Sequence, residues 1–335
     1  MYRADVNLDR STIKSIILRY YDLDVISLKK VRAAYKVATE HGAYGFKNAA
    51  ELPDLSFIRN CTEHIKKNGF PHLPDILPTN TGESLVQYDG EIYYMEQWID
   101  AEEVSKANAA VIGKIGIALA DFHHAAKGLL PAPDSSRFGW GKRRDFLRDA
   151  YLQILNWKKQ DRTVLGIGLE RQMLDFLQYR CWLAHEYLKE VSYSNLLADS
   201  PEAAVLCHGS LHHKNILVGK EEEIWFIDWE SMIYAERVLD LAQLLHYHAP
   251  PHAWNPSVIR RFFHGYQSRL STPIAREEWK CFFSYLAFPR RFYTWMNRYF
   301  DTQQPTVKAY FKLKKIIDQD LGKEMFLQQF PPNRI

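Results

Sequence analysis

The sequence predicts an α+β protein in which a small antiparallel sheet precedes a larger, mainly helical part. Strand-like alternation and turn residues fill the first 97 positions, together with two helical segments. Beyond Trp98 the apolar residues recur with helical spacing. Short strands and a polar loop at 205–230 interrupt that helical part. We therefore expect one domain at 1–97, a linker at 98–105 and a second domain at 106–335 that contains the 205–230 loop.

In the first domain, Ile13, Ile16 and Ile17 fall on one face of a predicted helix, which Asp9 or Ser11 could cap. The dipeptide Asp89-Gly90 between two apolar runs is the strongest hairpin signal in the chain. The expected helices are 10–21 and 54–67. The expected strands are 26–34, 35–39, 43–47, 84–88 and 91–97.

In the second domain, Val111, Ile115, Leu119 and Phe122 line one face of a long helix. The same kind of periodicity predicts further helices at 143–159, 170–191, 237–248, 256–270, 276–298 and 305–321. The strand and loop segment at 205–230 falls between the helices predicted at 170–191 and 237–248. The element order is therefore sheet, short connection, then helices with one insertion.

Composition excludes several classes of protein. The formal charge is +3 over 335 residues, and the basic clusters Lys142-Arg-Arg144 and Arg290-Arg291 are short, so we expect solvated faces and no nucleic-acid partner. No apolar run approaches the ~20 residues that span a bilayer, and the start lacks a signal peptide. We expect cytoplasmic synthesis, no secretion and no membrane partner. The four cysteines form no Cys-x-x-Cys pair, which favours buried reduced thiols.

The loop region carries the chemistry. Two apolar runs, 205–207 and 216–218, bracket the polar sequence His208-Gly-Ser-Leu-His-His-Lys-Asn215. A third apolar run, 224–227, ends on Asp228. Short strands of this kind bring a polar loop and a carboxylate to one place.

His208-Gly209 with Asn215, followed by Ile-Asp228-Trp-Glu, resembles the catalytic and metal loops of the aminoglycoside phosphotransferase and choline kinase family. That family has a protein-kinase-like fold, with an antiparallel N-lobe and a helical C-lobe. The order of elements fits it along nearly the whole chain. The resemblance implies ATP and Mg²⁺ as cofactors, and a small-molecule substrate if the chain is active.

The sequence also resembles, through less specific motifs, the kinase-like spore coat proteins of the CotS type. This resemblance is carried by Ala118-Leu-Ala-Asp-Phe-His-His124, by Phe138-Gly-Trp-Gly-Lys142 and by Phe226-Ile-Asp-Trp-Glu230. These segments are packing motifs. The resemblance implies a role in sporulation, a place in the spore coat and other coat proteins as partners.

The family pattern assigns nucleotide-binding roles in the first domain. Lys47 corresponds to the lysine that contacts phosphates. Glu63 on the following helix corresponds to its carboxylate partner, with Glu51 as the alternative. Glu96-Gln97-Trp98 falls at the hinge that binds adenine through backbone groups, a placement by order alone.

The same pattern assigns Asp228 and Asn215 as magnesium ligands, because both offer the oxygen atoms that this ion prefers. Glu230 either assists the metal or faces solvent. His208 is expected to orient the loop, and Asp240 to brace it from behind as a structural residue. His212 and His213 have no metal spacing and are expected to be exposed.

Two departures from the family point towards weakened catalysis. Ser210 stands where the family has its catalytic aspartate, and loss of a general base costs ~10²–10⁴ in rate. The turn that would cover the phosphates, 31–35, contains no glycine, the residue that lets backbone N–H groups approach phosphates.

We therefore predict a pseudokinase with weak or lost ATP and Mg²⁺ binding and little or no transferase activity. The alternative is an active ATP-dependent kinase for a small hydroxyl-bearing molecule. In that case His212 or a relocated carboxylate would replace the missing base.

Overall fold

The computed structural model describes residues 5–50, 52, 54–105, 108–160, 169–302 and 307–331. The chain divides into two compact units. The first comprises Met1–Val104 and Lys214–Ser231, and the second comprises Ser105–His213 and Met232–Ile335. Residues 214–231 therefore belong with the sheet unit, whereas the sequence analysis placed all of 205–230 in the second domain.

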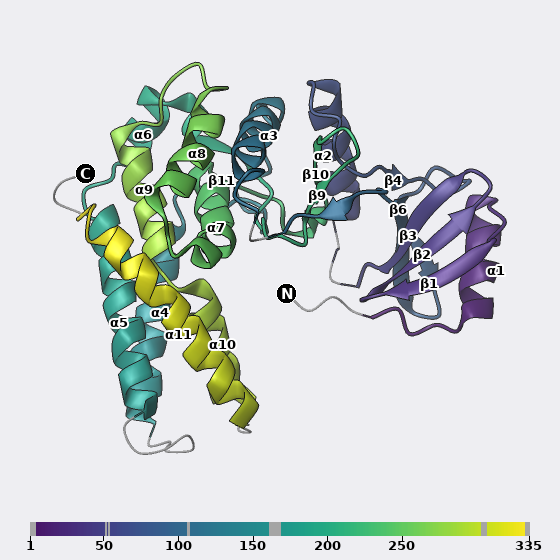
Figure 1. Cartoon of the computed structure of the whole chain (residues 1–335). Helices are drawn as coiled ribbons and strands as arrows, with labels where there is room; N and C mark the ends of the chain where they lie inside the picture. The colour runs from purple at the N-terminus through teal and green to yellow at the C-terminus, as the bar shows by residue number, and fades with distance from the viewer. Residues whose placement is uncertain are drawn as a thin grey trace. The chain divides into compact units, whose positions relative to one another are not determined.

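The first unit is built on an antiparallel sheet of order β1-β2-β3-β6-β4, with β5 also paired to β6 (Figure 1). Its strands are β1 (Ser27–Val31), β2 (Ala34–Thr39), β3 (Gly42–Asn48), β4 (Ile76–Leu77), β5 (Val86–Tyr88) and β6 (Glu91–Gln97). Its helices are α1 (Arg10–Tyr21) and α2 (Leu55–Lys67). Helix α1 packs its apolar face, including Ile13 and Ile17, against sheet residues such as Val37 and Phe46.

Local sequence signals explain two of these elements. The side chain of Asp9 accepts hydrogen bonds from the Ser11 and Thr12 N–H groups and caps α1, as predicted. Asp89 and Gly90 both have positive φ, +51° and +76°, which is the geometry of a two-residue hairpin turn between β5 and β6. The predicted hairpin is confirmed.

Residues 214–231 join the first unit through main-chain pairing. They contain β9 (Ile216–Val218), β10 (Ile224–Phe226) and the short helix η2 (Trp229–Ser231). Strand β9 lies between β10 and β7 (Glu102–Glu103) in a second small sheet. The Phe226 N–H also donates to the His72 carbonyl at 3.1 Å. These long-range pairs are the reason that the domain boundary differs from the prediction.

The second unit is mainly helical (Figure 1). Its helices are α3 (Ile112–Ala125), α4 (Arg143–Lys159), α5 (Leu169–Leu188), α6 (Tyr193–Asp199), α7 (Val238–His248), α8 (Pro256–Gln267), α9 (Arg276–Ala287), α10 (Arg290–Thr302) and α11 (Val307–Leu327), with short turns η1 (Pro201–Ala203) and η3 (Pro250–His252). Strands β8 (Ala204–Cys207) and β11 (Ile233–Glu236) form a two-stranded sheet. Helix α9 packs against both α5 and α7.

Several boundaries in this unit differ from the predictions. The single helix predicted at 276–298 is wrong, because it breaks into α9 and α10 at Pro289. Phe288 is extended (ψ 119°), as expected of a residue before proline. Helix α6 and strand β11 were not predicted. The start of the helix predicted at 305–321 lies outside the described residues, and α11 extends further, to Leu327.

Helices α3 and α8 approach unusually closely, and glycine makes this possible. A Cβ on Gly116 would lie 2.4 Å from the Phe262 carbonyl oxygen, and one on Gly265 would lie 2.2 Å from the Gly113 carbonyl oxygen. Side chains at these positions would force the helices apart. The close contact positions His123 of α3 beside Tyr266 of α8.

The burial of the cysteines agrees with what the sequence predicts for them. All four cysteines are buried free thiols, as predicted. None of the helices in the described part of the chain combines the length and apolar character needed to span a bilayer.

Candidate functional site

A cluster of opposite charges surrounds the buried Lys47 in the first unit. Lys47 lies on β3 and is 6% exposed. Its Nζ lies 2.5 Å from Glu96 Oε1 and 2.9 Å from Asp228 Oδ1. The Tyr94 ring centroid lies 5.8 Å from the same atom, and the Tyr94 hydroxyl donates to Glu230 at 3.2 Å. The lysine charge is therefore balanced inside the protein.

Strand register explains how Glu96 reaches Lys47. Strands β3 and β6 are antiparallel, with Lys47 opposite Tyr94 and Gly45 opposite Glu96. Residues two apart on a strand point to the same face, so Tyr94 and Glu96 both lie on the face that carries Lys47. The alternation along 91–97 was the signal that could have identified Glu96 as a side-chain partner.

The predicted partner Glu63 has a different role. Its carboxylate accepts from Arg59 Nε at 2.9 Å in an i,i+4 pair on α2, and the Glu63 side chain is 59% exposed. The alternative, Glu51, lies outside the described residues. Among the described residues, the carboxylates paired with Lys47 come from β6 and from the end of β10, not from α2.

Asp228 and Asn215 lie at the same end of the β9–β10 pair. Ile216 is opposite Phe226 in the register, and the Ile227 N–H donates to the Asn215 carbonyl at 3.0 Å. Asn215 is 4% exposed. Asp228 adopts a left-handed backbone, with φ +69°, which is uncommon for a residue other than glycine and is typical of functional turns.

These two side chains suit a magnesium ion, because carboxylate and amide oxygens are the donors that this hard cation prefers. A bound ion would neutralise phosphate charge. It would also have to share Asp228 with the Lys47 ammonium, which contacts the Asp228 carboxylate directly. The donor set fits the metal, and the existing ion pair competes with it.

The predicted hinge uses its backbone donors internally. The Gln97 N–H donates to the Asp75 carbonyl at 2.7 Å, and the Trp98 N–H donates to the Ala43 carbonyl at 2.9 Å. The Trp98 ring lies 5.1 Å from Lys36 Nζ. An adenine that used these two amides would first have to break both bonds.

The start of the polar loop lies in the second unit. Asp240 on α7 is fully buried and accepts from the backbone N–H groups of His208 (2.7 Å) and Gly209 (2.9 Å). Gly209 has φ +76°, which a side chain would disfavour. This is the geometry that a bracing residue requires. The catalytic significance of the loop stays a prediction.

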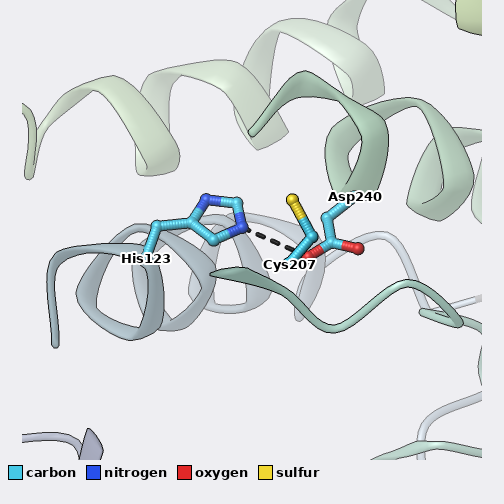
Figure 2. Close-up of side chains that lie close together, drawn as sticks. All are labelled: His123, Cys207 and Asp240. Atoms are coloured by element: carbon cyan, nitrogen blue, oxygen red, sulfur yellow. Dashed lines mark hydrogen bonds and ion pairs between the residues drawn. The ribbon is translucent and has the colours of Figure 1, made fainter. Parts of the chain in front are cut away.

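Behind Asp240 lie two more buried side chains. Figure 2 shows the His123 ring directed at the Asp240 carboxylate with the Cys207 sulfur beside them. His123 Nε2 lies 3.2 Å from Asp240, and His123 Nδ1 lies 2.9 Å from the Tyr266 hydroxyl. Burial lowers the pKa of His123, opposed by its bond to Asp240. The histidine therefore joins α3, α7 and α8 behind the loop.

The donor atoms of His123, Cys207 and Asp240 lie within 4.8 Å of one another, close enough to hold a metal ion. Burial raises the pKa of the Cys207 thiol well above its ordinary value, and a protonated thiol is a poor ligand. Asp240 already accepts two backbone N–H groups and contacts His123. The cluster is a hydrogen-bonded brace.

Gln243, one turn after Asp240 on α7, fixes the next part of the loop. Its Nε2 donates to the Gly209 carbonyl at 2.8 Å, and its Oε1 accepts from the Leu211 N–H at 3.0 Å. The Ser210 N–H donates to His208 Nδ1 at 3.3 Å. Sequence reasoning missed Gln243, although its i,i+3 spacing from Asp240 places both on one helix face.

The boundary between the two units falls inside the loop, between His213 and Lys214. Ser210 therefore belongs to the second unit, and Asn215 and Asp228 belong to the first. His212 and His213 were expected to be exposed but are partly buried, and the His212 ring lies 5.5 Å from Tyr247 in an edge-on contact.

With the geometry established, comparison with known proteins identifies the family. A family model described as "Spore coat putative kinase YutH" matches residues 14–330. The chain belongs to this family. The predicted resemblance to kinase-like spore coat proteins is thereby confirmed, and the YutH family assignment covers both units.

Individual relatives agree with the YutH assignment. Spore coat protein S of Bacillus subtilis (strain 168) is 24% identical over 346 residues, covering 95% of this chain and 94% of that protein. An aminoglycoside phosphotransferase structure from Alicyclobacillus acidocaldarius subsp. acidocaldarius DSM 446 matches with a TM-score of 0.76 at 17% identity, covering 97% of this chain and 96% of that one. An AMP-bound spectinomycin phosphotransferase matches with a TM-score of 0.66 at 17% identity, covering 95% and 98%. This chain has the kinase-like fold of these enzymes, which confirms the predicted fold class.

Proposed function

We propose that this YutH-family chain is a kinase-like spore coat component with little or no transferase activity. One observation carries the proposal: the loop is fully braced by Asp240 and Gln243, yet Ser210 stands where a catalytic carboxylate is expected. A serine hydroxyl cannot accept a proton from a substrate near neutral pH as a carboxylate can. The loop keeps its shape and lacks the base.

The surroundings of Lys47 and the β1–β2 hairpin support the same proposal. Lys47 contacts two carboxylates, those of Glu96 and Asp228, where the family pattern provides one, so phosphates would have to compete with the additional carboxylate. In the β1–β2 hairpin, Val31 pairs with Ala34, which leaves a two-residue turn without glycine. Arg32 in that turn forms an ion pair with Glu103. This tight hairpin offers little backbone for covering phosphates.

The proposal of a coat location and of coat-protein partners is based on similar proteins. The similar Bacillus subtilis protein is named as a spore coat protein, and the description of the family model, a spore coat putative kinase, also names the coat. We propose that this chain is assembled into the coat with other coat proteins and acts there by binding.

A second candidate function is an active kinase for a small hydroxyl-bearing molecule. The observation that favours it is the retention of Lys47, Asn215 and Asp228, the set that would hold phosphates and magnesium. His212, which lies on the same loop with its ring against Tyr247, or a relocated carboxylate would then replace the missing base.

A nucleotide titration tests the proposal. We expect ATP and MgCl₂ at about 1 mM each to raise Tm by less than about 1 °C, because binding weaker than millimolar adds less than about 0.4 kcal/mol. Transfer from radiolabelled ATP to small alcohols at about 1–100 per second, the ordinary kinase range, would instead establish the second function.

Restoring the carboxylate tests the role of position 210. We expect Ser210→Asp to raise residual ATP hydrolysis by about 10²-fold, the lower end of a general-base contribution. Ser194→Asp, which adds the same charge at an exposed position of α6, is the matched control. Unchanged hydrolysis in a Ser210→Asp protein that binds ATP would show that the base is not what is missing.

A further inference from the structure

A cavity of about 290 Å³ lies within the second unit, next to the braced loop. It is lined by residues from the start of α4, from β11, from α7 and from the α9–α10 junction. Gln243, which holds the loop backbone, is part of its wall. Its charged lining residues are Lys142, Arg143 and Arg290, and none of the described lining residues is an aspartate or glutamate.

Arg143 is the unusual member of this group. The sequence analysis expected its basic cluster to be solvated, and for Arg143 this is wrong, since it is only 7% exposed. Its Nη2 donates to the Ser284 carbonyl at 3.1 Å, and its Nε is buried without a hydrogen-bond partner. The guanidinium lies over the rings of Tyr285 (4.4 Å), Phe146 (5.1 Å) and Phe288 (5.3 Å).

A buried cation normally has a carboxylate partner, because desolvation of an unpaired charge is costly. Arg143 forms no ion pair with any described residue. Burial lowers its pKa, and the like charge of Arg290 acts in the same direction. Lys142 and Arg290 are exposed and likewise have no ion-pair partner in the described part of the chain. Three cations without an ion-pair partner among the described residues therefore line one cavity.

The neighbouring ionisable groups form no ion pair with these cations, although the Glu236 charge acts to raise the pKa of Arg143. Burial lowers the pKa of His246, a wall residue, to about 3, so it is neutral near pH 7. The buried Glu236 carboxylate accepts from the Tyr285 hydroxyl at 2.7 Å and from the Gly141 N–H at 3.3 Å. It forms no ion pair with Arg143.

We propose that this cavity binds a small organic anion. Its carboxylate or phosphate group pairs with Arg143, because the planar guanidinium matches both oxyanions and still has free N–H donors. Its apolar body packs against Phe138, Leu239 and Phe288, which also line the cavity. A volume near 290 Å³ suits a single-ring compound, at the small end of ligand sites.

This inference goes beyond the proposed function, because binding requires neither ATP nor phosphoryl transfer. It also predicts selectivity by charge, since cationic amines would be repelled by Lys142, Arg143 and Arg290. The competing explanation is that the aromatic rings alone stabilise Arg143 as a structural residue. In that case no anion would bind.

Calorimetric titration of the full chain with four single-ring probes tests the charge selectivity. We expect benzoate and phenyl phosphate to bind, and benzamide and benzylamine to bind at least about tenfold more weakly, the effect of losing a buried charge pair. The stronger of the two anions identifies the oxyanion that the site prefers. Equal binding of all four probes, preference for benzylamine or no binding of either anion would overturn the proposal.

Substitutions test the assignment to this cavity. We expect Arg143→Met to weaken anion binding at least about tenfold. The exposed Lys142→Gln and Arg290→Gln should each weaken it about two- to fivefold, more at low salt than at high salt. Arg291→Gln, the adjacent arginine outside the cavity, should leave the affinity unchanged. Unchanged affinity in folded Arg143→Met would overturn the assignment.

Circular dichroism first establishes whether Arg143→Met is folded. If it is not, the double variant Lys142→Gln/Arg290→Gln decides, because both positions are exposed. Retention of full affinity in that double variant would overturn the proposal. ATP is absent from these titrations, so their outcome is independent of the transferase assays.

Discussion

Lys47 and Arg143 are both buried cations, 6% and 7% exposed, yet their surroundings differ. Lys47 contacts two carboxylates, from Glu96 and Asp228. Arg143 contacts one carbonyl oxygen and three aromatic rings. The two cations lie in different units, and each is central to one candidate binding site.

The difference shows that the partners of a buried cation indicate whether it is available to bind an anionic ligand. A cation with internal carboxylates is satisfied, so an incoming phosphate has to displace them. A cation without a carboxylate is left for an anion from outside. The candidate nucleotide site around Lys47 therefore has its cation paired with internal carboxylates, whereas Arg143 in the cavity beside the loop has no carboxylate partner among the described residues.

The largest expected effect is at Lys47. Lys47→Met would leave the partly buried Glu96 and Asp228 carboxylates without their cation, and we expect the free energy of unfolding to fall by about 3–5 kcal/mol. Urea denaturation followed by circular dichroism measures this change. Adding Glu96→Gln should restore part of the stability. A loss below about 1 kcal/mol would contradict the paired state of Lys47.

His246 tests the charge balance around Arg143 through pH. Its folded-state pKa of about 3 lies below the ordinary 6.5, with burial as the main cause and the Lys323 charge second. The unfolded chain therefore binds the proton first, and stability present above pH 6.5 is lost as pH falls towards 3. The contribution is up to about 1.4 kcal/mol per pH unit.

We expect His246→Gln to flatten the stability profile between pH 6.5 and 3, measured by urea denaturation at each pH. Parallel slopes for His246→Gln and the unsubstituted chain would mean that His246 is charged in the folded state.

Arg143→Met gives a direct counterpart to Lys47→Met. No carboxylate loses its partner, so we expect a loss of only about 1–2 kcal/mol, from the ring contacts and the bond to the Ser284 carbonyl. Denaturation of both variants under one set of conditions compares them. A larger loss at Arg143 than at Lys47 would reverse the comparison and favour a structural role for Arg143.

Glu63 should give the smallest effect. Its pair with Arg59 lies on the helix surface, so we expect Glu63→Gln to change stability by less than about 0.5 kcal/mol. Glu96→Gln should cost clearly more in the same denaturation experiment. Equal effects would mean that Glu63 also supports Lys47.

Signals contained within a few residues predicted much of the fold. Asp9 caps α1, and Asp89-Gly90 forms the hairpin turn, because short-range geometry decides both. Pro289 is also a local signal, because a proline disfavours helix at the residue before it, and the predicted helix at 276–298 ran through it. The pairings of β8 with β11 and of β9 with β7 could not be predicted, since they join short strands far apart in the sequence.

The sequence motifs predicted some residues of the candidate site and not their partners. The positions of Lys47, Asn215, Asp228 and Asp240 came from spacing and resemblance. The sequence analysis did not identify the Glu96 side chain as the partner of Lys47, because that pairing depends on strand register. It also took Arg143 for a solvated residue, because a basic cluster gives no indication of which member is buried.

The sequence by itself determined the kinase-like order of elements, the serine at position 210 and the residue types of the polar loop. Only the tertiary structure decided which carboxylates neutralise Lys47 and which cation is left without one. The physical reason is that the cost of a charge depends on burial and on partners from distant segments. Motifs record residue types, and packing decides their electrostatic surroundings.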